Sequence, residues 1–339
     1  MGFRTAPFSF ICFLFLFDYY TQKAYNNHIM NKCEKLSVRK ARIRVKENLD
    51  LLLKSKQTIK DIFEISFSRK NFTLFNLVKY NSLTEVTYKE AYDKVCSFAS
   101  YFDKNIDKNE KYVGLLLENT PEFIYTLYGL LMSGHAPILL STKANEESNL
   151  EILGNLNSHV VVSDYRFNKG NIVTINPYKI NEETKVIDAW ADEIVFVTSG
   201  TSGKSKIILY TGKELTEQII NASGIVKNYP QIASTYKGYL KHLVILPFYH
   251  VFGFIAVFLW FSFFNTTFVL PSSLASIKVR EAAIIGEPTH IFAVPLFWDT
   301  VTKGIEHVVH QKKAEKKFTK GINASLLVQK LMPRKGPNF

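Results

Sequence analysis

The order of apolar and polar positions along the chain predicts alternating helices and strands. Residues 84–104 place apolar side chains at helical spacing, and Thr87 and Glu90 stand in the arrangement of an N-terminal capping box. Residues 112–140 give an apolar strand, then a helix with Pro121 in its first turn, then a second apolar strand. This succession is that of a β-α-β unit, in which the two strands run parallel.

The same alternation continues over most of the chain. Residues 145–158 are typical of a helix and residues 159–164 of a short apolar strand. Residues 213–229 predict another helix, and residues 239–271 predict a strand, a turn, an apolar helix and a strand. We therefore expect an α/β protein whose parallel-rich sheets are covered by helices.

Residues 196–210, which include parts of two runs of β-formers (193–198 and 206–210), carry two glycines, several hydroxyl residues and two lysines. Glycines let backbone N–H groups turn inward, and hydroxyls and lysines add donors, so such a loop suits an anion such as phosphate. An ordinary Ser/Thr/Gly surface loop has the same composition. The common phosphate loop, G-x-x-x-x-G-K-[ST] before a helix, is not matched, because Thr198 stands where its first glycine would be.

Two short stretches carry a family resemblance. The sequence TSGTSGKSK (residues 198–206) resembles the signature loop of the adenylate-forming superfamily, T-S-G-T-T-G-x-P-K, with Ser202 in place of a threonine and Ser205 in place of the proline. The sequence PFYHVFGF (residues 247–254) resembles a second motif of that family, P-L-F-H-x-x-G. The likeness in the order of elements extends over about residues 59–305.

The resemblance implies the N-terminal domain of an acyl-CoA synthetase-like ligase, incomplete on its C-terminal side. It implies that a carboxylate attacks the α-phosphate of ATP, that Mg²⁺ shares the phosphate charge, and that coenzyme A then takes the acyl group. No residue is assigned as a metal ligand, and Lys204 is expected to face solvent. The residues that the resemblance assigns to the β- and γ-phosphates of ATP are Thr198, Ser199, Gly200, Thr201, Ser202, Gly203 and Lys206.

His250 admits two interpretations. A single histidine among aromatic residues is commonly a packing residue. By resemblance, it lies where the acid meets the nucleotide phosphate, and is assigned as the catalytic residue. With Phe252 and Gly253 it then lines the substrate pocket, and the apolar surroundings favour a fatty or aryl acid as the small-molecule partner.

Three elements of the resembled enzymes are missing from the chain: a Y-G-x-T-E segment, a T-G-D segment, and a small domain with a catalytic lysine. The only YG falls within a predicted helix, at Tyr128, and the TG at Thr211 continues to lysine. We therefore expect a fragment with little activity alone. The alternatives are a non-catalytic acid- or phosphate-binding protein that needs a partner chain, and a phosphotransferase with an ordinary phosphate loop.

Composition places the basic charge at the two ends of the chain. The 339 residues are 47% hydrophobic and carry a net charge of +12. Residues 31–60 and residues 311–339 each contribute +7, which leaves about −2 for the remainder. Nucleic acid is not an expected partner, because base-stacking aromatics are not interleaved with these charges. The three cysteines have no CxxC spacing, which fits a reducing cytoplasm.

The N-terminal flank predicts two further segments. Residues 36–53 form a basic amphipathic helix that either packs on the core or lies on an anionic membrane surface, a peripheral contact. Residues 7–18 are apolar but too short to span a bilayer, so they suggest a signal-peptide core or a start placed ahead of Met30. The expected division is 1–29 (leader or mis-assigned start), 30–58 (basic helical segment) and 59–339 (AMP-binding N-terminal domain with a basic helical tail, 306–339).

Overall fold

The computed structural model describes residues 37–311 apart from 168–170, 186, 200–204, 229–239 and 264, together with residues 316 and 320. The described residues from 37 to 292 belong to one compact body, and helix α11 (Pro295–Gln311) belongs to a second unit. The expected leader, residues 1–29, and most of the expected tail lie outside the described residues.

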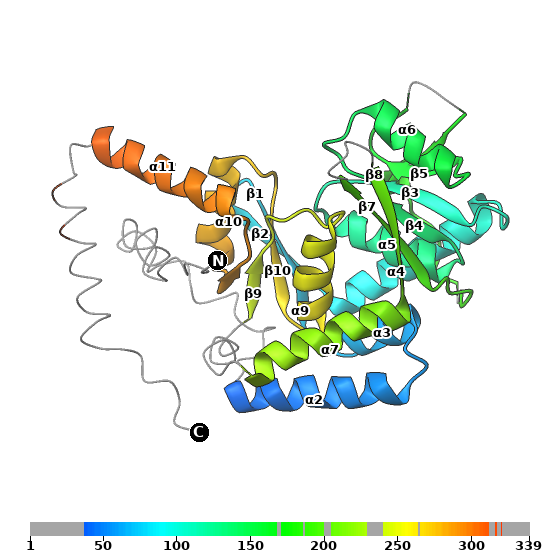
Figure 1. Ribbon diagram of the computed structural model, residues 1–339, viewed down its shortest axis with the longest axis horizontal. Coiled ribbons are helices and arrows are strands. Elements are labelled where there is room, and N and C mark those ends of the chain that lie inside the picture. The colour runs from blue at the N-terminus through cyan, green and yellow to red at the C-terminus, as the bar shows by residue number, and fades with distance from the viewer. Residues whose placement is uncertain are drawn as a thin grey trace. The chain divides into compact units, whose positions relative to one another are not determined.

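The larger sheet of the body is almost entirely parallel (Figure 1). Its strand order is β6-β5-β3-β4-β7-β8, and every neighbouring pair is parallel except β7 and β8, which form an antiparallel pair at one edge. The strands are β3 (Tyr112–Leu116), β4 (Ala136–Leu139), β5 (Val160–Ser163), β6 (Val173–Ile175), β7 (Glu193–Ser199) and β8 (Ser205–Thr211).

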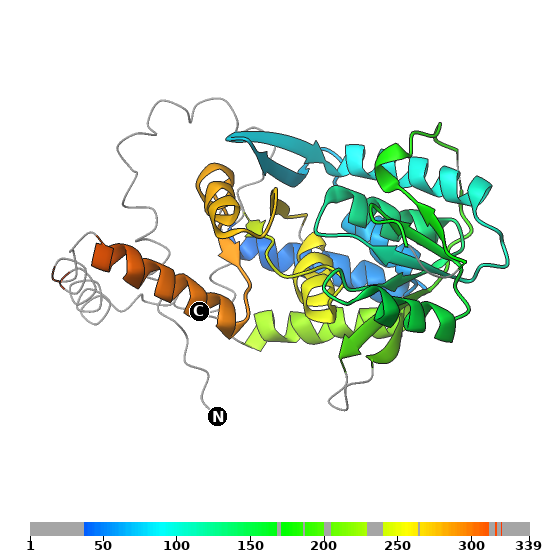
Figure 2. The ribbon, with the colours of Figure 1, turned by 90° about the horizontal axis from the view of Figure 1, so that it is seen from above.

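The second sheet has the order β11-β9-β10-β1-β2. Its strands β1 and β2 form an antiparallel hairpin that Figure 2 shows from above, and its other neighbouring strands are parallel. Helix α10 packs against β1 and β10. The strands are β1 (Thr73–Lys79), β2 (Ser82–Thr87), β9 (Lys241–Leu243), β10 (Thr267–Pro271) and β11 (His290–Ile291).

Helices join and cover these sheets. Helix η2 (Phe252–Leu259) is a π-helix that runs on into the short α9 (Trp260–Ser262). The other helices in the described part of the body are α2 (Val38–Lys54), α3 (Ile59–Ser66), α4 (Tyr88–Asn105), α5 (Pro121–Met132), α6 (Glu146–Asn155), η1 (Pro177–Lys179), α7 (Gly212–Asn228) and α10 (Ser276–Gly286).

Local sequence signals account for the start of α4 and for the turn between α5 and β4. The Thr87 hydroxyl oxygen accepts from the backbone N–H of Glu90 at 3.1 Å, and the Glu90 carboxylate accepts from the backbone N–H of Thr87 at 2.7 Å. This is the predicted capping box at the start of α4. After α5, Gly134 adopts a φ of +96°, a conformation that glycine adopts readily, and the chain turns into β4. The α/β fold with parallel-rich sheets covered by helices is confirmed.

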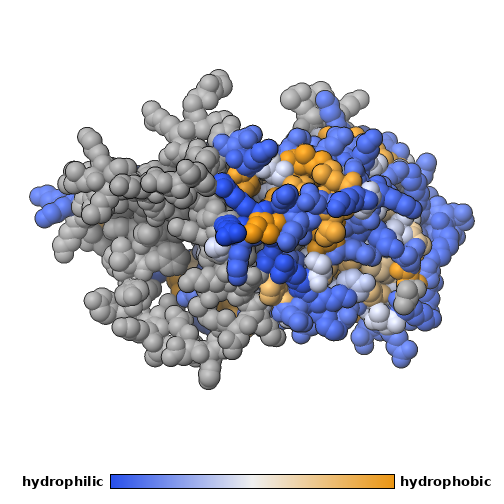
Figure 3. Space-filling model, turned by 90° about the horizontal axis from the view of Figure 1, so that it is seen from below, coloured by the Kyte–Doolittle hydropathy of each residue, from blue (hydrophilic) through white to orange (hydrophobic). Residues whose placement is uncertain are grey.

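The basic helix predicted near the N-terminus is α2. Its residues Ala41, Val45 and Leu52 are buried in the main hydrophobic core, so one face packs on the body. Ile43 and Leu53 are exposed on the helix. Seen from below, the described surface is mostly hydrophilic with separate apolar patches (Figure 3). Among the residues described, no helix is both long and apolar enough to cross a bilayer. Contact of α2 with a membrane surface stays a prediction, as do the segment boundaries at 30 and 59.

Candidate functional site

The glycine-rich loop lies between two strands, as its flanking sequence predicts, and these strands, β7 and β8, pair antiparallel. In the pairing of β7 with β8, Thr198 lies opposite Lys206, and Ser199 lies opposite Ser205. These last pairs of the β7–β8 hairpin belong to the resembled signature. The assigned residues Gly200, Thr201, Ser202 and Gly203 lie outside the described residues.

Burial along β7 tells which face of the sheet the hairpin ends present. Phe196 belongs to the main core, whereas Val195 belongs to a smaller cluster around α6 on the other face. Side chains alternate along a strand, so Thr198 shares the face of Phe196. Directly opposed residues of an antiparallel pair also share a face, so Lys206 lies on this same side, where its side chain is exposed.

The turn that carries His250 reaches this same face. The ring of Phe196 packs on the ring of Phe254 in η2, with centroids 5.9 Å apart. The Phe254 N–H donates to the His250 carbonyl at 2.9 Å. The first turn of η2, with His250 just before it, therefore belongs to the sheet face that holds Thr198 and Lys206.

His250 stands on a tight turn at the entrance to η2. Its backbone N–H donates to the Pro247 carbonyl at 3.1 Å. A Cβ on Gly253 would overlap that same Pro247 carbonyl oxygen, so the close approach of helix and turn requires a glycine at this position. His250 reaches solvent, and partial burial lowers the pKa of its imidazole below the ordinary 6.5. The imidazole is therefore neutral at pH 7. The neighbouring Phe252 side chain is 52% exposed.

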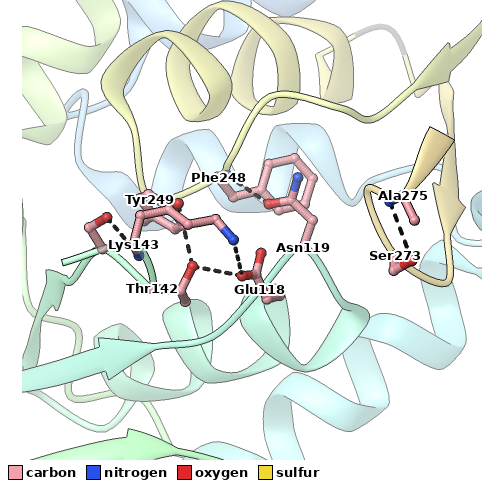
Figure 4. Close-up of polar contacts among 9 residues, drawn as sticks. Glu118, Asn119, Thr142, Lys143, Phe248, Tyr249, Ser273 and Ala275 are labelled. Carbon is pink, nitrogen blue, oxygen red and sulfur yellow. Dashed lines mark hydrogen bonds and ion pairs between the residues drawn. The ribbon is translucent and has the colours of Figure 1, made fainter. Parts of the chain in front are cut away.

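Asn119, in the loop between β3 and α5, holds this turn (Figure 4). Its side-chain N–H donates to the Leu246 carbonyl at 2.8 Å, and its side-chain oxygen accepts from the Phe248 N–H at 2.8 Å. The sequence interpretation did not single out Asn119. The signal available for it was its place just after a parallel strand, since the carboxyl ends of such strands commonly form sites.

A second polar group lies beside it at the ends of β3 and β4. The Thr142 hydroxyl donates to Glu118 at 2.7 Å, and the Lys143 ammonium lies 3.5 Å from the same carboxylate oxygen. The Tyr249 hydroxyl lies 3.4 Å from the Thr142 hydroxyl, so the two side chains point toward one another across the site (Figure 4). These residues were also not anticipated from the sequence.

The arrangement offers donors for an anion and a neutral imidazole next to apolar rings. The Thr198 hydroxyl and the Lys206 ammonium are groups that hydrogen-bond readily to phosphate oxygens. In the part of the chain that the structure describes, no group of three or more His, Cys, Asp or Glu side chains could hold a metal ion.

A protein-family comparison identifies most of this region. The family model described as AMP-binding enzyme matches residues 70–332. Over 139 residues the chain is 25% identical to gramicidin S synthase 2 of Brevibacillus brevis, a match that covers 39% of this chain and 3% of that protein.

Solved structures share the fold. An o-succinylbenzoate CoA synthetase of Bacillus subtilis, in complex with its acyl-adenylate intermediate, superposes with a TM-score of 0.56 at 22% identity, covering 67% of this chain and 60% of that one. The same enzyme in complex with ATP and magnesium superposes with a TM-score of 0.59 at 20% identity, covering 71% of this chain and 50% of that one. The N-terminal subdomain of NpsA from Klebsiella oxytoca, in complex with 3-hydroxybenzoyl-AMSN, superposes with a TM-score of 0.55 at 16% identity. This match covers 70% of this chain and 59% of that one. The chain thus spans 50–60% of these structures' length.

Proposed function

The chain belongs to the family of AMP-binding enzymes, and on that premise we propose that it takes part in activating a carboxylic acid with ATP. In the first stage an acid oxygen bonds to the α-phosphorus of ATP, and the bond to pyrophosphate breaks. In the second stage a thiol, coenzyme A in this proposal, takes the acyl group and AMP leaves.

The β7–β8 hairpin is proposed to hold the phosphate end of ATP. The observation that supports this most is the pairing of Thr198 with Lys206 at the base of the loop, on the sheet face that η2 covers. Lys206 would neutralise charge on the β- and γ-phosphates while Mg²⁺ shares that charge when bound. The other proposed phosphate contacts are Ser199, Gly200, Thr201, Ser202 and Gly203.

His250 is proposed to face the acid. A neutral imidazole donates or accepts one hydrogen bond at each ring nitrogen, so it can orient a carboxylate without forming a fixed ion pair. Phe252 and Gly253 would border the same pocket. Because an apolar wall offers no partner to a polar substituent, a fatty or aryl acid is the proposed substrate class.

Titration calorimetry of the whole chain tests the phosphate site. Mg·ATP and inorganic pyrophosphate are each expected to bind, and Lys206→Ala is expected to weaken both by about tenfold, the effect of one lost charge-assisted contact. Lys204→Ala is the matched control, a lysine two positions earlier that should change affinity little. Equal losses in the two variants, or no binding by the unaltered chain, would contradict the proposal.

A second candidate is a binding protein that needs a partner chain. In this candidate the chain binds an acid or a phosphate, and turnover requires the partner chain. Acid-dependent exchange of pyrophosphate into ATP is therefore expected to be near background. Robust exchange by the purified chain would exclude this candidate and support a self-sufficient enzyme. A cytoplasmic location, with membrane contact through the basic flanks, is proposed with either candidate, and cell fractionation tests it.

A further inference from the structure

We propose that Asn119 is a positioning residue that sets the place of His250 in the site. The inference rests on the proposed function for its meaning in ligand binding, but its structural part concerns only the turn between β9 and η2. One side chain from the loop after β3 fixes the backbone of that turn on both sides of Pro247.

The two hydrogen bonds use both ends of the Asn119 amide. The donor end satisfies the Leu246 carbonyl and the acceptor end satisfies the Phe248 N–H, each at 2.8 Å. Between them, Pro247 has no N–H of its own, so this segment cannot continue an ordinary strand ladder. The Asn119 side chain therefore acts as the peptide group of a missing neighbouring strand.

The backbone that Asn119 holds is hydrogen-bonded to His250. The Pro247 carbonyl lies between the two clamped groups, and it accepts from the His250 N–H at 3.1 Å. The Phe248 ring is held between Phe123 of α5 and Phe258 of η2, with centroids 5.7 and 5.4 Å away. A turn fixed at backbone and side chain leaves His250 little freedom to shift.

The chemistry of the contact requires asparagine. Aspartate keeps an acceptor for the Phe248 N–H but loses the donor to Leu246, and leucine has neither group. A second side-chain contact of the turn is weaker, since the Tyr249 hydroxyl lies 3.4 Å from that of Thr142, near the limit for a hydrogen bond. Loss of the Asn119 amide should therefore let the turn move.

The experiment compares Asn119→Leu with Asn48→Leu in the whole chain. The Asn48 side chain donates to the carbonyl of Phe263, just beyond the far end of the same helical run, so this control removes a similar hydrogen bond away from His250. The first readout is the NMR titration of the His250 ring, assigned with His250→Gln. Its pKa is expected to rise toward 6.5 in Asn119→Leu, because the turn becomes more solvated, and to stay unchanged in Asn48→Leu.

A second readout is binding of a fatty or aryl acid in the presence of Mg·ATP. Asn119→Leu is expected to weaken acid binding by about tenfold or more, because a displacement of His250 by about 1 Å is enough to break its contact with the acid. Asn119→Asp keeps one of the two hydrogen bonds, so its acid affinity should lie between those of the unaltered chain and Asn119→Leu. It also replaces Asn119→Leu in both measurements if that variant does not fold. Binding by Asn48→Leu should match the unaltered chain.

Two outcomes would overturn the inference. One is an unchanged His250 titration in both Asn119 variants. The other is an equal shift in Asn48→Leu, which would show a general loosening of the fold. If the unaltered chain binds neither Mg·ATP nor acid, the proposed function fails, and the His250 titration still decides whether Asn119 positions the turn.

Discussion

The ring of Phe196 in β7 lies against the ring of Phe254 in η2, with the two centroids 5.9 Å apart. Both side chains are fully buried. Phe196 stands two residues before Thr198, and Phe254 stands four residues after His250. The contact therefore couples the base of the glycine-rich loop to the helix that follows the proposed catalytic residue.

Removing either ring should cost stability, and the two costs should not add. Phe196→Ala and Phe254→Ala are each expected to lower the free energy of unfolding by about 3–5 kcal/mol, as for other buried phenylalanines. The double variant should lose about 0.5–1.5 kcal/mol less than the sum, because the aromatic contact is lost only once. Urea unfolding of the four proteins measures this.

Phe252→Ala is the control for that cycle. Its side chain is 52% exposed, so its removal should change the free energy of unfolding by about 0.5 kcal/mol or less. Strict additivity of the Phe196 and Phe254 variants would show that the two rings do not couple the loop and the helix.

Local sequence signals made the order of helices and strands predictable. Contacts between residues far apart in the sequence could not be predicted. The capping box at Thr87 and the turn at Gly134 depend on residues a few positions apart, so the order of helices and strands followed from the sequence. The place of the glycine-rich loop between two strands followed from two β-forming runs, whereas the antiparallel pairing of β7 with β8 did not.

Asn119 shows where such reasoning stops. Its partners, Leu246 and Phe248, lie 127 and 129 residues away, and no local pattern distinguishes it from an ordinary loop asparagine. The π-helical form of η2 was also beyond prediction, since a segment that is apolar on every side predicts a buried helix without fixing its winding.

Gly253→Ala should destabilise the turn before η2. The added methyl would overlap the Pro247 carbonyl, a backbone atom that Asn119 holds in place through its two neighbours. We expect a loss of about 1–3 kcal/mol in the free energy of unfolding, typical of overpacking. The His250 ring resonances should also shift in the NMR spectrum.

Gly154→Ala is the matched control, because a Cβ at this position in α6 meets nothing within 4 Å. It should raise the free energy of unfolding by up to about 1 kcal/mol, the helix-propensity gain of alanine over glycine. If Gly253→Ala proved as stable as Gly154→Ala, the close approach of η2 to Pro247 would not exist in solution.

His242 predicts a dependence of stability on pH. Its ring is completely buried in β9, with its centroid 3.8 Å from that of Phe261 and 5.0 Å from that of His290. Within the described part of the chain, neither ring nitrogen has a hydrogen-bond partner. Burial, and secondarily the charge of His290, hold the pKa of His242 well below the ordinary 6.5.

The sign follows from which state binds the proton. Below pH 6.5 the unfolded chain protonates His242 and the folded chain does not, so the contribution to stability is complete above pH 6.5 and declines as the pH falls. Burial lowers the pKa of His135 and His250 in the same direction. Stability should therefore decrease between pH 7.5 and pH 5.5, with a slope from His242 approaching about 1.4 kcal/mol per pH unit.

Urea unfolding at these two pH values, in the unaltered chain and in His242→Leu, tests the assignment. The variant should lose less stability on acidification, because the group that resists protonation is gone. Phe261→Leu changes the packing around the same ring without removing a titratable group, so it should lower stability at both pH values and keep the pH dependence of the unaltered chain. If His242→Leu kept that pH dependence as well, the buried imidazole would not be its source, and His135 and His250 would have to account for it.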